Sequence, residues 1–275
     1  MNKLSLQKRA QIIGMLVEGN SMRAVSRMAD CSINTVTKLL VDIGYACQFY
    51  QAQVIKNVEA KRVQADEIWS FCGSKEKNVA PENKGVLGYG DVYTWTAIDA
   101  DTKLAISWLV GRRDHEYAET FIADLASRLA GRIQLTTDGH GPYLGAVEKI
   151  FGGAIDYAML VKHYEGQALP DQRRYSPAKF VSADKRRIVG NPNIDDVSTS
   201  FVERQNLTMR MGMRRFTRLT NGFSKKIDNL EHAVALHFMH YNFARIHKTL
   251  RVTPAMEAGL SDHVWTLEEI AALLD

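Results

Sequence analysis

Residues 63–71 read Val63-Gln64-Ala65-Asp66-Glu67-Ile68-Trp69-Ser70-Phe71, a β-rich run that carries Asp66 where apolar residues would otherwise dominate. Its branched and aromatic residues favour a strand, and a charge inside such a strand needs a reason. Two more strand-like runs follow at 92–99 and 103–110, and the Asp-rich segment between them is favourable turn chemistry. We therefore expect three antiparallel strands in this part of the chain.

The next elements alternate between helix and strand. Apolar residues recur at helical spacing over 115–129, a short strand at 132–138 ends on Asp138, and a helix at about 143–151 leads to a strand at 155–164. In open α/β sheets ligands usually bind at the carboxyl ends of strands, but Asp-Gly is also a common turn pair. Asp138 alone therefore leaves a functional and a structural reading open.

A third acidic residue, Glu203, precedes an all-basic segment. From Arg204 through Lys226 the chain carries seven Lys or Arg residues and no Asp or Glu. The alternative to a functional role is an ordinary surface helix with a Glu in its first turn, where the helix dipole favours a negative charge. If the segment is helical at ~100° per residue, one side carries the following residues: Glu203, Asn206, Leu207, Arg210, Arg214, Thr217 and Arg218. That side would place one acid beside several phosphate-binding groups.

The beginning of the chain is typical of a helix-turn-helix. Helical spacing and capping residues predict three short helices at 5–18, 22–29 and 33–43, the last ending at Gly44. Between residues 3 and 38 there are six basic residues, Arg9 among them, and two acidic ones. A small helical bundle for protein contacts is the alternative. In a helix-turn-helix the last helix enters the major groove with its first residues facing the bases, which here are Ser32, Asn34, Thr35 and Lys38.

A long polar segment lies between the fifth strand and the Glu203 helix. Residues 165–195 contain three prolines and many basic residues, and a loop of this length in a compact domain is usually functional or disordered. We expect its positive charge to contact a phosphate backbone, with a merely solvated loop as the alternative. The residues that we expect to bind DNA from this segment are Arg173, Arg174, Lys185, Arg186 and Arg187.

The composition limits the class of protein. The chain has 275 residues, 45% of them hydrophobic, and a net charge of +4, so a sizeable core is expected and charge distribution matters more than total charge. No apolar run approaches the ~18 to 20 residues that span a bilayer, and the first residues lack a signal-peptide core, so we expect a cytoplasmic protein. Three cysteines without a C-x-x-C spacing argue against a disulfide framework and a zinc ribbon.

We expect four regions along the chain: a helix-turn-helix domain at 1–47, a linker at 48–62, an α/β domain at 63–258 with the basic insertion at about 165–195, and a C-terminal tail with a short helix at 259–275. A long helix is predicted at 224–246. Its two histidines, His237 and His240, have no evident carboxylate partner, so we interpret them as packing or surface residues rather than metal ligands.

The three acids come from separate elements of a βββαβαβα order. That order is required by a ribonuclease-H-like fold, a mixed five-stranded sheet with flanking helices, which brings Asp66, Asp138 and Glu203 to one sheet edge. Clustered carboxylates raise one another's pKa unless a cation neutralises them. Hard oxygen ligands suit Mg²⁺ or Mn²⁺, and two such ions ~3.5 to 4 Å apart can activate a nucleophilic oxygen and stabilise the leaving oxygen of a phosphodiester.

Three motifs carry a resemblance to a known family: Ala65-Asp66-Glu67-Ile68-Trp69-Ser70, Thr137-Asp138-Gly139 followed by Tyr143, and Val202-Glu203-Arg204-Gln205-Asn206-Leu207-Thr208-Met209-Arg210, which continues to Phe223-Ser224-Lys225-Lys226. A further stretch, from His240-Tyr241-Asn242 to Thr253-Pro254-Ala255, is similar to the segment that follows the catalytic glutamate in many integrase-like transposases. Over residues 60–258 the chain resembles a DDE transposase of the insertion-sequence-one family.

The resemblance implies a function and a set of site residues. Asp66, Asp138 and Glu203 would form the catalytic, metal-binding triad for Mg²⁺ or Mn²⁺. The enzyme would recognise the terminal inverted repeats of an element, cleave them and transfer the 3′-hydroxyl into target DNA. It would act as a homodimer or larger assembly on the nucleoid of a prokaryotic-type cell. A metal-dependent nuclease of the same fold and a DNA-binding regulator derived from a transposase are the alternatives.

Overall fold

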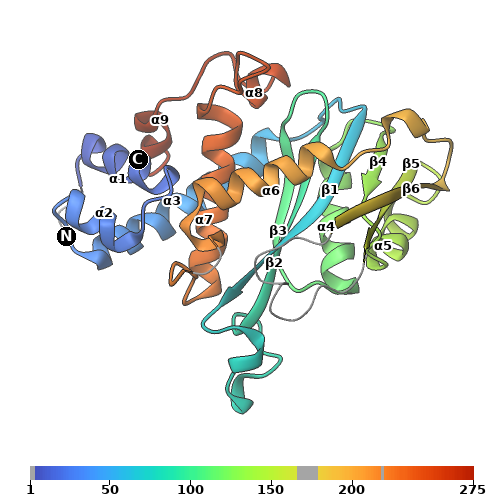
Figure 1. The fold of residues 1–275 in the computed structure, drawn as a ribbon. Helices are drawn as coiled ribbons and strands as arrows, with labels where there is room; N and C mark the ends of the chain where they lie inside the picture. Colours follow the sequence, from blue (N-terminus) through green and yellow to red (C-terminus); the bar gives the residue numbers. More distant parts are fainter. Residues whose placement is uncertain (1–3, 166–178, 218–219) are drawn as a thin grey trace.

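The computed structural model describes residues 4–165, 179–217 and 220–275 of the chain. It is a mixed α/β structure in which a six-stranded sheet carries helices on both faces (Figure 1). The strands, in chain order, are β1 (Arg62–Cys72), β2 (Gly90–Asp99), β3 (Ala105–Gly111), β4 (Gln134–Thr137), β5 (Asp156–Glu165) and β6 (Lys179–Val189).

The strand order across the sheet is β3-β2-β1-β4-β5-β6. The first three strands pair antiparallel as a meander, β1, β4 and β5 run parallel, and β6 is antiparallel to β5. This arrangement is compatible with the predicted ribonuclease-H-like fold and confirms a mixed sheet with flanking helices. The predicted number of five strands was wrong.

The sixth strand, β6, lies inside the segment that we expected to be a basic loop. Its residues are exposed along almost the whole length, and it occupies the edge of the sheet beside β5. A strand without a buried face shows no alternation of apolar and polar residues, so the period-two pattern that identifies strands is missing from its sequence. Residues 166–178, the rest of the expected loop, lie outside the described residues.

Different helices cover the two faces of the sheet. On one face, α4 (His115–Arg128) and α5 (Pro142–Phe151) pack against β1, β2 and β4. On the other face, α6 (Ser200–Gly212) and α7 (Ile227–Met239) pack against β1, β2 and β3. Figure 1 shows α6 crossing the sheet at β1. The site-bearing strand is therefore covered from both sides.

The first three helices are α1 (Leu6–Val17), α2 (Met22–Met28) and α3 (Ile33–Val54). Each begins after a serine whose hydroxyl accepts a backbone N–H of the first turn, as expected for Ser5 and Ser32. The expectation that Gly44 ends α3 was wrong. A Cβ at Gly44 would lie 2.4 Å from the Cβ of His232 in α7, so this glycine permits close packing of two helices.

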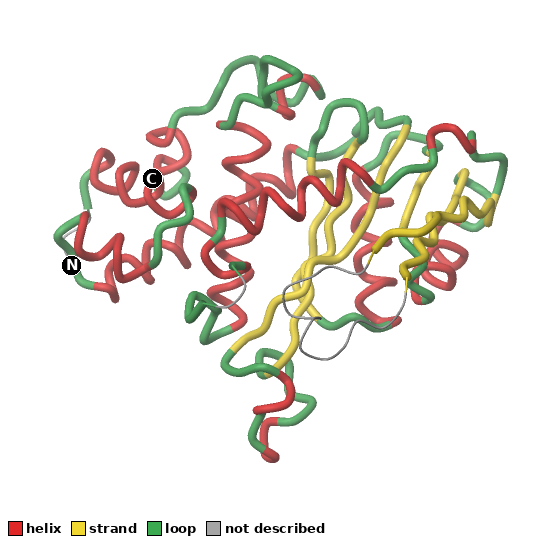
Figure 2. Tube along the Cα trace, in the orientation of Figure 1, coloured by secondary structure: helices red, strands yellow, loops and turns green. Residues whose placement is uncertain are grey.

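Because α3 continues through Val54, the first residues of the expected linker at 48–62 are helical. The division of the chain into domains stays a prediction. After α7 the chain forms a π-helical turn (His240–Ala244), then α8 (Pro254–Glu257) and α9 (Leu267–Ala272). Figure 2 shows both chain ends on the helical side of the molecule, where α9 contacts α1.

The helix that carries Glu203 is shorter than the sequence suggested. It ends at Gly212, and Arg214 belongs to a separate 3₁₀ turn at Arg214–Phe216. The expected helical stripe is therefore limited to the part between Glu203 and Arg210. Among the helices of the described segments, we find none with the length and apolar content that crossing a lipid bilayer requires.

Candidate metal centre

The register of two parallel strands brings the predicted aspartates together. Ala65 of β1 pairs with Thr137, the last residue of β4, and an aspartate follows each of these residues directly. Asp66 and Asp138 therefore stand side by side where β4 ends and β1 continues. The carboxylate of Asp138 also accepts the backbone N–H of His140 at 2.9 Å, which orients it at the start of the following turn.

Glu67 is the third member of the acidic cluster. One carboxylate oxygen from each of Asp66, Glu67 and Asp138 lies within 4.8 Å of the other two. Successive residues of a strand normally point to opposite faces. Here Asp66 and Glu67 can both contribute to the cluster, because β1 has no partner from β4 beyond Ala65. Carboxylates from the two faces of β1 can therefore meet at this open edge.

Arg113, in the connection between β3 and α4, holds Glu67 and Asp138. Its Nε donates to Oε2 of Glu67 at 3.0 Å, and its Nη2 lies 3.6 Å from Oδ2 of Asp138. The Glu67 side chain is only 1% exposed. Despite the ion pair with Arg113, burial and the charge of Asp138 raise the pKa of Glu67. The charge of Arg113 therefore compensates only part of the negative charge of the cluster.

Burial and then the neighbouring charges of Glu67 and Asp138 raise the pKa of Asp66 to about 7. Such a site keeps its acids close at an electrostatic cost that a bound cation would remove. Two buried acceptors, Oε1 of Glu67 and Oδ1 of Asn206, lack a hydrogen-bond donor among the described residues. The Tyr143 hydroxyl is near enough to lower the pKa of Glu67 without completing a hydrogen bond. Three clustered carboxylates with spare oxygens fit a hard divalent cation.

The N-terminus of α6 is anchored to β1. The side-chain oxygen of Gln64 accepts the backbone N–H groups of Phe201 and Val202 at 2.8 and 3.2 Å, two of the donors that a helix start leaves unpaired. One turn later, Nδ2 of Asn206 donates to Oδ2 of Asp66 at 2.9 Å. These contacts hold the helix across the strand that carries the aspartate.

Glu203 lies on this anchored helix but outside the cluster of three. Its Oε1 accepts hydrogen bonds from Lys162 of β5 and from the hydroxyl of Thr199, the latter at 2.5 Å. Its charge still contributes to raising the pKa of Asp66, so the two carboxylates are electrostatic neighbours. The structure thus brings Asp66 and Asp138 together and places Glu203 beside them, paired with a lysine.

The residues that we expected to read bases lie at the start of α3. Ser32 uses its hydroxyl as the helix cap for the N–H of Thr35, whose own hydroxyl is 2.9 Å away. Asn34 is exposed, and Lys38 forms an exposed ion pair with Asp42 at 2.6 Å. Exposed pairs of this kind are weak, so Lys38 remains available to an anion.

The other expected DNA-binding residues are dispersed. Lys185, Arg186 and Arg187 are exposed on β6, where Lys185 donates to the backbone oxygen of Ile194 at 2.7 Å. Arg210 is half-buried on α6 and Arg214 is exposed in the turn after it. Asn206 is buried on α6, where it donates to Asp66. Three more of the expected residues lie outside the described residues: Arg173, Arg174 and Arg218.

Sequence reasoning missed Glu67, Arg113 and Lys162. Glu67 follows Asp66 directly, and successive residues of a strand normally point to opposite faces, so the sequence gives no sign that the two share a site. Arg113 and Lys162 come from elements that only the sheet order brings close. Arg9, one of the six basic residues counted between residues 3 and 38, is buried and donates to the backbone oxygen of Ala271.

Comparisons with known proteins give little. No family model matches the chain, and no curated protein matches it. The solved structures similar to it include those described as "Mos1 transposase paired-end complex with left transposon end" (11% identity, TM-score 0.23) and "Crystal structure of the Mos1 Strand Transfer Complex" (12% identity, TM-score 0.23). Each match covers 55% of this chain and 57% of the other. At such a TM-score, neither likeness bears on the fold or activity of this chain.

Proposed function

We propose that this protein is a DNA transposase that binds the ends of an insertion element, cleaves phosphodiester bonds and transfers the freed 3′-hydroxyl into target DNA. The observation that carries the proposal is the meeting of Asp66 and Asp138 at the open edge between β1 and β4, with Glu203 beside them on α6. The motifs that supply these residues are those that resemble the insertion-sequence-one transposases.

In this proposal Asp66, Glu67 and Asp138 hold Mg²⁺ or Mn²⁺, and Glu203 serves a second ion or completes the first site. A bound divalent ion would supply Lewis-acid activation of the attacking oxygen and neutralise charge on the leaving oxygen. The chain's own residues position the ligands. Asn206 and the backbone N–H of Glu67 fix the two oxygens of Asp66, at 2.9 and 2.8 Å.

Two cations of the chain take part in the proposed cycle. Arg113 holds Glu67 and Asp138 in place while the site is free of metal. Lys162 neutralises Glu203, and its release frees that carboxylate for the reaction. Both side chains can then meet the negative charge of a DNA phosphate, which is the group that lysine and arginine bind in nucleic-acid complexes. Pairing of two element ends by a dimer or larger assembly belongs to the same proposal.

The test is a strand-transfer assay with DNA that carries the inverted repeats flanking the coding sequence, in Mg²⁺. We expect joined products from the wild-type and none from Asp66→Asn, Asp138→Asn or Glu203→Gln, with DNA binding largely retained. We expect Glu67→Gln to lower strand-transfer activity roughly 10- to 100-fold, which is the usual cost of changing a residue around a bound metal ion. Glu82→Gln, at an exposed residue of the extension between β1 and β2, is the control.

Each other outcome has its own meaning. Nicked DNA without joining supports a nuclease of the same fold instead of a transposase. Binding of the repeats without nicks or joining supports a DNA-binding regulator. Retained joining in any one variant removes that residue from the triad.

A further inference from the structure

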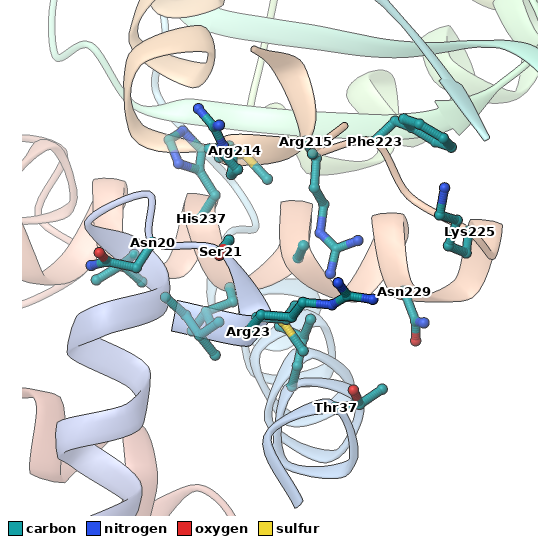
Figure 3. Close-up of a pocket in the computed structure, with 18 of the residues that line it drawn as sticks. Asn20, Ser21, Arg23, Thr37, Arg214, Arg215, Phe223, Lys225, Asn229 and His237 are labelled. Carbon is teal, nitrogen blue, oxygen red and sulfur yellow. The ribbon is translucent and has the colours of Figure 1, made fainter. Parts of the chain in front are cut away.

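A cavity of about 730 Å³ lies between the N-terminal helices and the segment that follows α6. Its walls come from α1, α2 and α3 on one side, and from residues 213–215, residues 221–225 and α7 on the other (Figure 3). The volume is within the ~300–1,000 Å³ typical of ligand sites in proteins. The acidic cluster contributes no residue to it.

The charges of this cavity have one sign. Among its lining residues that the structure describes, four are Lys or Arg and none is Asp or Glu: Arg23, Arg214, Arg215 and Lys225. None of the four is in an ion pair with a carboxylate from the described parts of the chain. Arg215 donates to the hydroxyl of Ser224 at 2.7 Å, and the amine of Lys225 lies 3.3 Å from the ring centroid of Phe223. Both partners are uncharged and leave the positive charges uncompensated.

Figure 3 shows the side chains of Arg23 and Arg215 pointing toward one another across the cavity, one from α2 and the other from the turn after α6. Burial lowers the pKa of Arg215 to about 10, which still leaves it protonated at neutral pH. Two facing guanidinium groups repel each other, and a partly buried cation without a counter-ion is costly. Such an arrangement is stabilised when an anion lies between the two groups.

The surroundings favour a phosphate chain over a single small anion. The four cations come from three places in the chain, namely α2, the 3₁₀ turn after α6 and the segment before α7, and neutral hydrogen-bonding side chains line the same cavity, including Ser21, Thr37 and Asn229. Thr37 belongs to α3, whose first turn carries the residues expected to face bases. A DNA strand held there would pass its backbone beside the cavity.

We propose that this cavity binds consecutive phosphates of a DNA backbone, with Arg215 as the inner contact and Arg23 and Lys225 as the exposed ones. The inference rests on the proposed function for its choice of ligand, but it assigns a site separate from the acidic cluster. Arg and Lys contacts to phosphates provide affinity that does not depend on sequence and that falls steeply with salt.

The main test measures binding of a 30-base-pair duplex by fluorescence anisotropy in EDTA, where no cleavage occurs, over a range of salt concentrations. The variant Arg23→Gln/Lys225→Gln should bind roughly 10- to 100-fold more weakly at 0.1 M salt. The slope of log K against log salt should become less steep by about 2, because each lost phosphate contact reduces its magnitude by about 0.9. Lys149→Gln, on α5 and paired with Glu119, is the charge-matched control and should bind as the wild-type does.

A second variant separates binding from packing. Arg23→Glu places a carboxylate opposite Arg215, so the metal-free protein should melt at a higher temperature while its affinity for DNA falls. A lower melting temperature together with wild-type DNA affinity would show that Arg23 serves packing alone and would overturn the proposal.

The remaining outcomes distinguish the two proposals. An unchanged salt slope in the double variant overturns the cavity assignment and leaves the proposed function standing. Protection of the wild-type against melting by millimolar inorganic phosphate, with no change of DNA binding in the double variant, assigns the cavity to a small anion and also overturns it. A reduced slope in a protein that neither cleaves nor joins DNA supports the cavity and overturns the transposase.

Discussion

Asp66 is placed where its charge is unfavourable in the metal-free protein. It is largely buried beside Glu67 and Asp138, and these surroundings raise its pKa to about 7. The two hydrogen bonds that its carboxylate accepts, from the backbone N–H of Glu67 and from Asn206, offset only part of this cost. An asparagine has a single side-chain oxygen, so it could accept from Asn206 or from the backbone N–H of Glu67, but not from both. Stability and function therefore make opposite demands on this one residue.

Asp66→Asn should stabilise the metal-free protein at pH 8. The folded pKa of about 7 exceeds the ~3.9 of an exposed aspartate, so the stabilising effect of protonation is complete below pH ~4 and is lost as pH rises through 7. The neutral variant escapes this loss. We expect its free energy of unfolding to exceed that of the wild-type by on the order of 2 kcal/mol at pH 8, and by less at pH 5.5.

Urea unfolding in EDTA at the two pH values measures this difference. Asp195→Asn, at an exposed aspartate, is the control and should change stability little at either pH. A variant less stable than the wild-type at pH 8 would show that the Asp66 charge is favourable in the fold, contrary to the cluster described here.

At the same scale, the sequence could identify Asp66 and Asp138 because each is a charge in a place that favours apolar or turn residues. Glu67 could not be recognised in this way. Its participation depends on β4 ending beside Ala65, which opens the edge of β1 to side chains from both faces. Lys162 could not be found either, since its contact with Glu203 depends on which strand lies next to which.

At the scale of elements, Asn242 completes the outer edge of the sheet. It lies in the π-helical turn after α7, fully buried, and its side chain makes two hydrogen bonds to Ala105 of β3. Its Oδ1 accepts the Ala105 N–H and its Nδ2 donates to the Ala105 oxygen, both at 3.0 Å. Because β3 is an edge strand, these bonds take the place of a neighbouring strand.

Asn242→Leu should therefore destabilise the protein by about 2 to 4 kcal/mol, because a buried N–H and a buried carbonyl lose their partners together. Urea unfolding of the variant measures the loss. Asn34→Ala, at an exposed asparagine of α3, should stay within about 0.5 kcal/mol of the wild-type. Equal stability of the Asn242→Leu variant and the wild-type protein would mean that water can replace the asparagine at this edge.

The sequence could predict those elements whose ends depend on local residues alone. Helices with one apolar stripe and a capping residue, such as α1 and α4, were predicted within a residue or two at each end. The continuation of α3 past Gly44 was not, because a glycine that ends one helix in sequence serves close packing against α7 in space. The early end of α6 and the exposed strand β6 likewise depend on tertiary neighbours.

At the scale of the whole molecule, the N-terminal helices share the core of the sheet. Ala10 and Ile13 of α1 belong to the same buried cluster as Val63 and Trp95 of the sheet. Arg9, only 5% exposed, also ties α1 to the end of the chain. Its guanidinium donates to the backbone oxygen of Ala271 at 3.0 Å and to both carboxylate oxygens of Asp275 at 2.9 Å.

Arg9→Ala tests whether α1 to α3 unfold with the sheet or as the separate domain that the sequence suggested for residues 1–47. We expect a loss of about 1 to 3 kcal/mol, because the change removes the buried stem of Arg9, its ion pair with the half-exposed Asp275 and one of the hydrogen bonds to the Ala271 carbonyl. Since one core joins the two parts, hydrogen exchange followed by mass spectrometry should show faster exchange in peptides from both α1 and β2. Arg27→Ala, at an exposed arginine of α2, should leave both unchanged. Faster exchange confined to α1, α2 and α3, with β2 protected as in the wild-type, would instead show that these helices open independently of the sheet.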